Sequence, residues 1–258
     1  MAPGPDGETA PYRVVWRDGL ALVHLSCGKA NALNPRSLAA IERAFDEVEA
    51  GGARGVVLTG YDRFFSAGLD LVHLYELERD AMDGFMAWFD AIMLRVFAFP
   101  RPVVAAVAGH AVAGGAVLAL TCDGRVMGAG AGRFGLNEIR LGVPFPASAL
   151  EIVRHAVPAG SVERVLYDGE LFEPRAALTL GLVTEVVDGD VVEEARRACA
   201  RLASAPADAF ATIKTGLKGP AVERARAALR PLRHAFVDAW YAPEARMLIG
   251  EARVRLRG

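Results

Sequence analysis

The sequence has few cysteines, almost no net charge and no long hydrophobic run. Its three cysteines, Cys27, Cys122 and Cys199, lie far apart in apolar surroundings, so we expect reduced core thiols and no disulfide framework. The formal net charge of −2 provides no basic surface for nucleic acid. No apolar stretch approaches the roughly eighteen residues that span a bilayer, and no His/Cys cluster has metal-ligand spacing. These absences predict a cytoplasmic protein without nucleic-acid, membrane or metal partners.

The composition instead fits a globular enzyme with one large core. Hydrophobic residues make up 53% of the 258 residues and charged residues 23%. Residues 1–11 lack the basic and apolar regions of a signal peptide and are expected to form a flexible tail. Alternating strand and helix patterns over residues 12–187 predict an α/β core domain. Amphipathic patterns over residues 188–258 predict an all-helical C-terminal region.

Local signals place several elements within these regions. Two β-rich runs at 12–16 and 20–25 flank an Asp-Gly pair, which predicts a hairpin. Asn34 before Pro35 predicts the start of a helix, because asparagine caps helices and proline fits the first turn. Further patterns predict strands at 55–60, 103–107, 124–130 and 182–187, a long helix from about 70 to 99, helices at 147–156, 161–167 and 174–180, and tail helices at 188–203, 208–217 and 220–241.

The most informative stretch runs from Ala105 to Asp123. An apolar, strand-like run ends at Gly109, and a helix-compatible run follows the pair Gly114 and Gly115. A helix that begins on paired glycines leaves backbone N–H groups unpartnered at the positive end of its dipole. No side chain shields these groups from a ligand oxygen. The stretch therefore predicts half of an anion or oxyanion site.

The irregular segment 133–146 holds a second candidate, Glu138. Two prolines and two glycines argue against a helix here, although many of the residues are apolar. Apolar surroundings such as Val143 raise the pKa of a carboxyl group toward values useful for proton transfer. A surface glutamate paired with Arg133 or Arg140 is the alternative, and the residues alone leave both interpretations open.

Three motifs in this order resemble those of the crotonase superfamily, the enoyl-CoA hydratase/isomerase family. They are Asn31-Ala-Leu-Asn34, Phe65-Ser-Ala-Gly-Leu-Asp-Leu71 and Gly109-His-Ala-Val-Ala-Gly-Gly-Ala-Val-Leu-Ala-Leu-Thr-Cys-Asp123. The resemblance covers nearly the whole chain. It implies an α/β fold of the ClpP/crotonase-like type, a ββα spiral followed by a C-terminal helical region over 188–258 that mediates trimerisation. A homotrimer or hexamer is therefore expected.

The resemblance also implies an acyl-CoA substrate held by main-chain atoms. Family members grip the thioester carbonyl with two backbone N–H groups, and the matching positions here are Leu69 and Gly114. Such paired donors stabilise the enolate that forms when an α-proton leaves. Contacts with CoA carry over to Lys29, Ala30, Ala67, Asp70, Leu71 and Gly115. CoA is then part of the substrate, and no separate cofactor is expected.

Hydratases of the family use two glutamates, and this sequence retains one of them. Val117 occupies the first position and cannot carry a proton, whereas Glu138 matches the second. A lone glutamate resembles the Δ3,Δ2-enoyl-CoA isomerase branch, in which one carboxylate moves a proton from C2 to C4. Two alternatives stay open: an enoyl-CoA hydratase of fatty-acid β-oxidation assisted by Asp70, His73 or His110, and a non-catalytic acyl-CoA-binding member of the family.

Four aromatic residues follow the second motif at helical spacing. They are Tyr75, Phe85, Trp88 and Phe89. Their pattern fits the wall of an acyl pocket, and it equally fits the protein core or a subunit interface.

Overall fold

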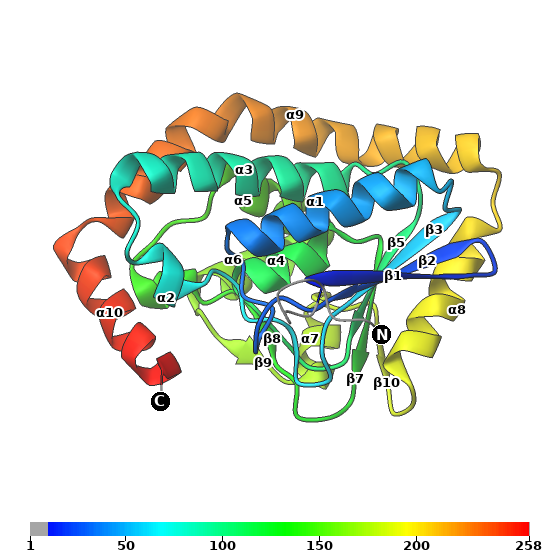
Figure 1. Ribbon diagram of the computed structural model, residues 1–258, viewed down its shortest axis with the longest axis horizontal. Coiled ribbons are helices and arrows are strands. Elements are labelled where there is room, and N and C mark those ends of the chain that lie inside the picture. The colour runs from blue at the N-terminus through cyan, green and yellow to red at the C-terminus, as the bar shows by residue number, and fades with distance from the viewer. Residues whose placement is uncertain (1–9, 258) are drawn as a thin grey trace.

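The computed structural model describes residues 10–257, which form two β-sheets wrapped by helices (Figure 1). The first sheet has the strand order β1-β2-β3-β5-β7-β10 and the second the order β4-β6-β8-β9. The strands are β1 (Tyr12–Arg17), β2 (Leu20–Leu25), β3 (Gly55–Thr59), β4 (Phe64–Ser66), β5 (Val103–Val107), β6 (His110–Val112), β7 (Gly124–Gly128), β8 (Phe134–Gly135), β9 (Leu171–Phe172) and β10 (Glu185–Val187).

The helices follow the expected alternation with the strands. They are α1 (Pro35–Ala50), α2 (Leu71–Leu74), α3 (Arg79–Phe97), α4 (Gly114–Thr121), the 3-10 helix η1 (Glu138–Leu141), α5 (Ala147–Ala156), α6 (Ala159–Tyr167), α7 (Pro174–Thr179), α8 (Val191–Ala203), α9 (Ala207–Trp240) and α10 (Pro243–Arg257). The irregular segment 133–146 thus contains a short strand and a 3-10 turn, and Glu138 begins that turn.

The predicted hairpin and first helix are confirmed. Strands β1 and β2 pair antiparallel through a turn in which Asp18 and Gly19 have φ of 54° and 75°. Positive φ at both turn positions matches the twist of the flanking strands. Asn34 caps α1, because its side chain accepts a hydrogen bond from the N–H of Ser37 at 3.1 Å. Strands β2, β3, β5 and β7 then run parallel, which confirms the strand–helix–strand unit.

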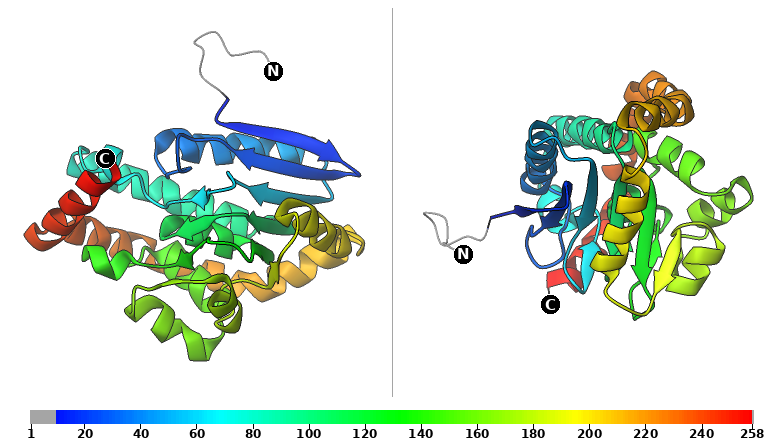
Figure 2. Two further views of the ribbon diagram at one scale, coloured as in Figure 1. Left: turned by 90° about the horizontal axis from the view of Figure 1, so that it is seen from below. Right: turned by 90° about the vertical axis from the view of Figure 1, so that its right-hand side faces the viewer.

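Helices cover both faces of the first sheet (Figure 2). On β3, Val56 and Leu58 face the large core beneath α1 and α3, whereas Val57 faces α8. Cys199 of α8 lies on that second face, buried as predicted for a free thiol. This alternation explains why the central strands are apolar on both sides.

The long helix predicted over residues 70–99 is wrong, because the segment breaks into α2 and α3. Contacts with the C-terminal helices keep the residues between α2 and α3 from continuing the helix. The hydroxyl of Tyr241 donates to the carbonyl of Leu77 at 2.5 Å, and the guanidinium of Arg246 lies 3.4 Å from the ring centre of Tyr75. The residues between α2 and α3 therefore contact the C-terminal helices and do not form part of one continuous helix.

In the C-terminal region the structure has one helix where the sequence predicted two. The helices expected at 208–217 and 220–241 form one continuous helix, α9, with Pro220 and Pro231 inside it. A proline removes one N–H and bends a helix, but packing can keep the helix continuous. Here α9 packs along α5 and α3, and this contact outweighs the local breakers.

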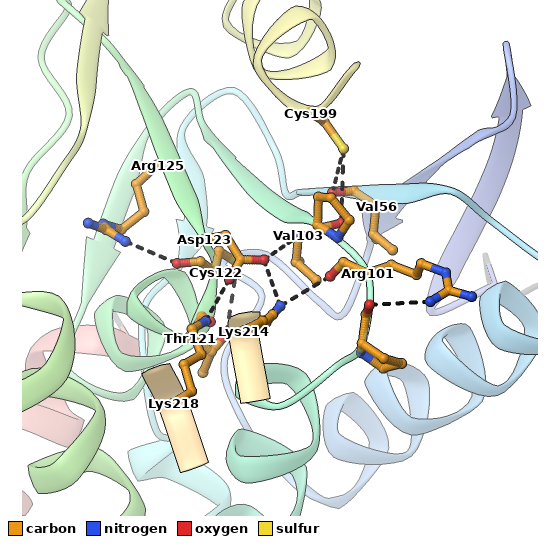
Figure 3. A network of polar contacts seen from close by, with 12 residues as sticks. Val56, Arg101, Val103, Thr121, Cys122, Asp123, Arg125, Cys199, Lys214 and Lys218 are labelled. Carbon is orange, nitrogen blue, oxygen red and sulfur yellow. Dashed lines mark hydrogen bonds and ion pairs between the residues drawn. The ribbon is translucent and has the colours of Figure 1, made fainter. Parts of the chain in front are cut away.

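A buried charge network anchors the first half of α9 to the core (Figure 3). Lys214 and Lys218 share the carboxylate of Asp123, with N–O distances of 2.6 and 2.8 Å. Lys214 also donates to the carbonyl of Arg101 and Lys218 to that of Thr121. Burial lowers the pKa of Lys214 to about 8. This anchor fixes the direction in which α9 leaves the core.

The N-terminal tail predicted over residues 1–11 lies mostly outside the described residues. Ala10 and Pro11 are described, and their carbonyls accept hydrogen bonds from the hydroxyl and N–H of Ser26. Along the described part of the chain, no helix is both long and apolar enough to cross a membrane.

Candidate active site

The loop after β2 positions the backbone of Leu69. The N–H of Leu33 donates to the carbonyl of Gly68 at 2.7 Å, and the N–H of Asp70 donates to the carbonyl of Leu33 at 2.9 Å. In such a parallel bridge the N–H of the residue between the two bonded groups points away from the partner. Within residues 10–257, the N–H of Leu69 donates no hydrogen bond and is therefore free to bind a ligand.

Hydrogen bonds from Asn31 hold the second motif segment, residues 65–71, in place. Its side-chain amide donates to the carbonyls of Leu25 and Phe65, and its carbonyl oxygen accepts from the N–H of Cys27 at 2.7 Å. Asn31 itself has a φ of 47°, a conformation that asparagine tolerates better than most residues. The Asn31-Ala-Leu-Asn34 motif therefore serves to fix the segment that carries Leu69.

Helix α4 begins at Gly114 as its sequence suggests. The first bonded N–H of this helix is that of Val117, which donates to the carbonyl of Ala113 at 3.0 Å. The N–H groups of Gly114 and Gly115 have no acceptor within the part of the chain that the structure describes. The start of α4 therefore presents free donors at the positive end of the helix dipole.

Ala113 precedes this helix in a strained conformation. Its φ of 51° and ψ of −127° lie in a region that L residues rarely adopt. Its N–H is bonded to the carbonyl of Gly135 at 2.8 Å, so the turn is fixed by the second sheet. Strain of this kind clusters at functional sites, where the surrounding structure enforces it.

Glu138 is buried, with 8% of its surface exposed. Its Oε2 atom has no hydrogen-bond partner among the described residues, and burial raises the pKa of the carboxyl to about 8. Arg133 and Arg140, the possible ion-pair partners of a surface glutamate at this position, do not pair with Glu138. Arg140 donates to the carbonyl of Asp168, and Arg133 pairs with Glu173. Within the described part of the chain, the carboxyl thus accepts a hydrogen bond only from the backbone of Glu138 itself, and its raised pKa keeps it mostly protonated at neutral pH.

One apolar cavity of about 310 Å³ lies beside Leu69, the strained Ala113 and Glu138, and these three residues line it. Its remaining lining comes from the second sheet, from the segments that follow its strands and from the C-terminal helices: Phe64, Ala67, Leu71, Val112, Asn137, Leu141, Val143, Phe236, Trp240, Ala252, Arg255 and Leu256. Its volume falls in the range of small-molecule sites, and its lining is mostly apolar with few polar groups.

The other predicted site residues fall into two groups. Ala67 and Leu71 line the cavity together with Leu69 and Glu138. The remaining positions, Gly114, Gly115, Lys29, Ala30 and Asp70, do not line it. Gly114 is the next residue in the chain after Ala113, which does line the cavity. Gly115 is packed against the core, since a Cβ atom there would lie 2.3 Å from the carbonyl oxygen of Ser66. Lys29 is exposed beside the same loop.

Asp70 has a structural role in this geometry. Its carboxylate accepts hydrogen bonds from the N–H of His73 at 3.0 Å and from the side-chain amide of Asn34 at 2.9 Å. His73 is exposed, and the Nδ1 atom of His110 accepts from the N–H of Arg133. None of these three assisting candidates lines the cavity.

The aromatic wall comes from a part of the chain that sequence reasoning missed. Phe236 and Trp240 of α9 line the cavity, whereas Tyr75, Phe85, Trp88 and Phe89 do not. The two α9 residues are one helical turn apart and both fully buried. Their spacing was visible in the sequence, but their place at this cavity follows from the packing of α9 on α3 and α5, which the sequence does not show.

No metal site accompanies the cavity in the described part of the chain. Across these residues, no group of three or more His, Cys, Asp or Glu side chains has the arrangement to hold a metal ion.

Two sheets of short strands wrapped by helices, followed by a C-terminal helical region, form the crotonase fold, which the solved structures reported below share. The sequence profile described as enoyl-CoA hydratase/isomerase matches residues 16–242. The chain belongs to the enoyl-CoA hydratase/isomerase family.

Individual relatives carry both names. A Thermus thermophilus protein, named provisionally as an enoyl-CoA hydratase, is 40% identical over 173 residues, 65% of this chain and 68% of its own. The structure of human mitochondrial Δ3-Δ2-enoyl-CoA isomerase matches with a TM-score of 0.89 and 26% identity, covering 96% of this chain and 98% of that one.

A Mycobacterium tuberculosis protein matches with a TM-score of 0.82 and 29% identity, over 88% of this chain and 99% of that one. It is described as an enoyl-CoA isomerase in one structure and as an enoyl-CoA hydratase in another. Names alone therefore do not decide between the two activities.

Proposed function

We propose that the protein isomerises 3-enoyl-CoA thioesters to 2-enoyl-CoA thioesters, with Glu138 as the single proton carrier. The observation that supports this most is the isolation of the Glu138 carboxyl in the apolar cavity, with its pKa raised to about 8 by burial. A carboxyl with a pKa near the working pH both accepts and returns a proton readily.

In the proposed reaction the Glu138 carboxylate removes a proton from C2. The electron pair moves into the conjugated system and places negative charge on the thioester oxygen. The N–H groups of Leu69 and Gly114 donate hydrogen bonds to that oxygen. Protonated Glu138 then returns the proton to C4, and the double bond moves from C3–C4 to C2–C3. No electrons leave the substrate, so the reaction needs no separate cofactor.

The environment of position 117 supports isomerisation over hydration. Val117 is fully buried in the core and does not line the cavity. Hydration needs one group to activate water and another to handle the proton at C2, and the cavity contains one carboxyl. A hydratase remains the second candidate, because several relatives carry that name. A binding protein without catalysis is disfavoured by the retained Glu138.

Two substrates separate these candidates. The isomerase converts 3-hexenoyl-CoA to 2-hexenoyl-CoA, which is followed by the rise in absorbance of the conjugated thioester, and it hydrates crotonyl-CoA slowly. Glu138→Gln removes the isomerisation, typically by at least about a hundredfold. Rapid hydration of crotonyl-CoA without isomerisation would favour the hydratase, and tight binding without either reaction would favour the binder.

We also propose a homotrimer or a hexamer as the functional assembly. Exposed apolar side chains on the C-terminal helices, including Ile213, Leu217, Met247 and Val254, support an interface there. Sedimentation or light scattering measures the mass, and a monomer at working concentration would contradict this part of the proposal.

A further inference from the structure

A lysine on α9 holds the far end of the helix that begins at Gly114. The Nζ atom of Lys218 donates to the carbonyl of Thr121, the last residue of α4, at 2.9 Å (Figure 3). The Nη1 atom of Arg125 donates to the next carbonyl, that of Cys122, at 3.0 Å. At this end of a helix the carbonyls have no partner within the helix and the dipole is negative. Two cations therefore cap α4 at the end opposite Gly114.

The side chains of α4 themselves provide no polar anchor to another element among residues 10–257. The helix consists of glycine, alanine, valine, leucine and one threonine, and all of its residues are buried. The hydroxyl of Thr121 donates to the carbonyl of Leu118 within the same helix. The apolar packing of α4 on α3 and α5 is not directional, whereas hydrogen bonds are. Polar contacts at the two ends of α4 therefore set its position along its own axis.

A displacement at the far end of α4 reaches its first residue because the helix is short. Its 8 residues span only about 12 Å, and backbone hydrogen bonds keep that length constant. The start of α4 packs directly against the backbone of Ser66 and Gly68, with no side chain between them to take up a shift. Movement of α4 along its axis therefore changes the distance and angle at which the N–H of Gly114 meets a thioester oxygen.

We propose that Lys218 is a positioning residue for the oxyanion donor at Gly114 and that it acts through α4. Lys218 fixes the last turn of this helix against α9, so the first turn presents its N–H groups at a constant place. Lys218 does not line the cavity and makes no contact with the substrate in this proposal. This inference rests on the proposed function, because it takes the start of α4 as part of the oxyanion site.

Lys214 differs from Lys218 mainly in the carbonyl that it contacts. The two lysines are 5% and 7% exposed, and both pair with the carboxylate of Asp123. Lys214 donates to the carbonyl of Arg101, ahead of β5, whereas Lys218 donates to that of Thr121 in α4. Replacing either lysine by methionine removes one positive charge from the same carboxylate and takes the lysine donor from one backbone carbonyl. Only the substitution at position 218 releases α4.

Infrared spectroscopy of a bound thioester tests the proposal without requiring turnover. Hexanoyl-CoA labelled with ¹³C at C1 isolates the carbonyl stretch, whose frequency falls as hydrogen bonds to the oxygen strengthen. We expect Lys218→Met to lose at least about half of the frequency shift that the parent protein induces, because a displaced N–H donates a weaker hydrogen bond. Lys214→Met keeps most of the shift. Lys218→Arg retains a cationic donor and keeps more of the shift than Lys218→Met.

The kinetics of isomerisation give a second readout. Hydrogen bonds to the oxyanion strengthen in the transition state, so their loss lowers kcat more than it changes KM. We expect Lys218→Met to lower kcat at least about tenfold and to change KM less than about threefold. Lys214→Met changes kcat less than about threefold. Thermal unfolding of each variant gives the folded fraction to which kcat refers.

Equal effects of Lys218→Met and Lys214→Met on the carbonyl frequency and on kcat would overturn the proposal, since lost charge or stability would then explain both. A parent-like frequency in Lys218→Met would overturn it as well. If Lys218→Met does not fold, Lys218→Gln and Lys214→Gln make the same comparison with a polar group kept at each position. A parent protein that binds hexanoyl-CoA without any shift of the carbonyl stretch contradicts the proposed oxyanion site itself, so the two failures are distinguishable.

Discussion

Gly68 and Gly114 are in direct contact: a Cβ atom on Gly68 would lie 3.1 Å from the amide nitrogen of Gly114. Gly68 immediately precedes Leu69, so this contact brings together the two backbone segments that carry the proposed oxyanion donors. Two segments from different motifs thus meet at a point where no side chain fits. The proposed chemistry depends on this close approach.

The first prediction tests that contact. In Gly68→Ala the new Cβ would lie 2.7 Å from the carbonyl oxygen of Val112, and alanine is strained at a φ of 83°. We expect a loss of at least about 1 kcal/mol of stability and at least a tenfold loss of kcat/KM. Gly84→Ala in α3 meets no atom within 4 Å and is expected to stabilise by about 0.5–1 kcal/mol. Equal effects of the two substitutions would contradict the prediction.

The second prediction concerns the strained residue before α4. Ala113→Gly relieves a backbone conformation with a φ of 51°, and we expect a gain of about 1 kcal/mol in the free energy of unfolding. Ala116→Gly, inside the helix, is the matched control and is expected to cost a similar amount. Denaturant titrations of both variants give the comparison. Destabilisation by Ala113→Gly would mean that the turn carries no strain.

The third prediction is the pH dependence of catalysis. Because burial raises the pKa of Glu138 to about 8, the carboxylate fraction of the free enzyme grows as the pH rises toward that value. We expect kcat/KM for isomerisation to rise up to about tenfold per pH unit below this pKa and to level off above it. A flat profile between pH 6 and about 9 would exclude Glu138 as the base.

The fourth prediction is a stability effect of the same carboxyl. Its pKa is raised from 4.5 to about 8 on folding, so the folded state binds the proton more tightly, and stability falls as the pH rises through this window. Glu138→Gln removes that dependence. We expect its stability relative to the parent to grow by several kcal/mol from pH 5 to about 9. Glu223→Gln at the surface serves as control, and parallel curves for Glu138→Gln and the parent would refute the assignment.

The fifth prediction concerns the network that directs α9. Asp123→Asn leaves Lys214 and Lys218 buried without a carboxylate, which is expected to cost about 3–5 kcal/mol. Asp238→Asn breaks the exposed pair with Arg79 and is expected to cost less than about 1 kcal/mol. Since α9 carries Phe236 and Trp240, the first variant should also weaken acyl-CoA binding in whatever fraction stays folded.

Local sequence signals predicted the elements whose structure depends on near neighbours. The Asp-Gly hairpin and the cap at Asn34 are of this kind, and both are confirmed. The breaks near Tyr75 and the continuity at Pro220 depend on contacts with distant helices, so local propensity gave the wrong answer at both places. Tertiary packing overrides propensity where a segment is committed to a partner far along the chain.

In the candidate site, too, some residues could be predicted from the local sequence and others could not. Paired glycines and an apolar loop with one carboxyl predicted Gly114 and Glu138 because backbone geometry and burial leave marks in the nearby sequence. Phe236 and Trp240 stand one helical turn apart in the sequence, but nothing in the local sequence shows that the packing of α9 on α3 and α5 brings them to the cavity.

The most direct test of the central claim is hydrogen exchange at C2 of hexanoyl-CoA in D₂O, followed by mass spectrometry or NMR. This saturated thioester cannot isomerise or add water, so exchange reports only enolate formation by a base beside the thioester. We predict exchange with the parent protein and a loss of at least about a hundredfold in Glu138→Gln. Exchange that survives Glu138→Gln unchanged, or a parent protein that binds the thioester without exchange, would contradict the account.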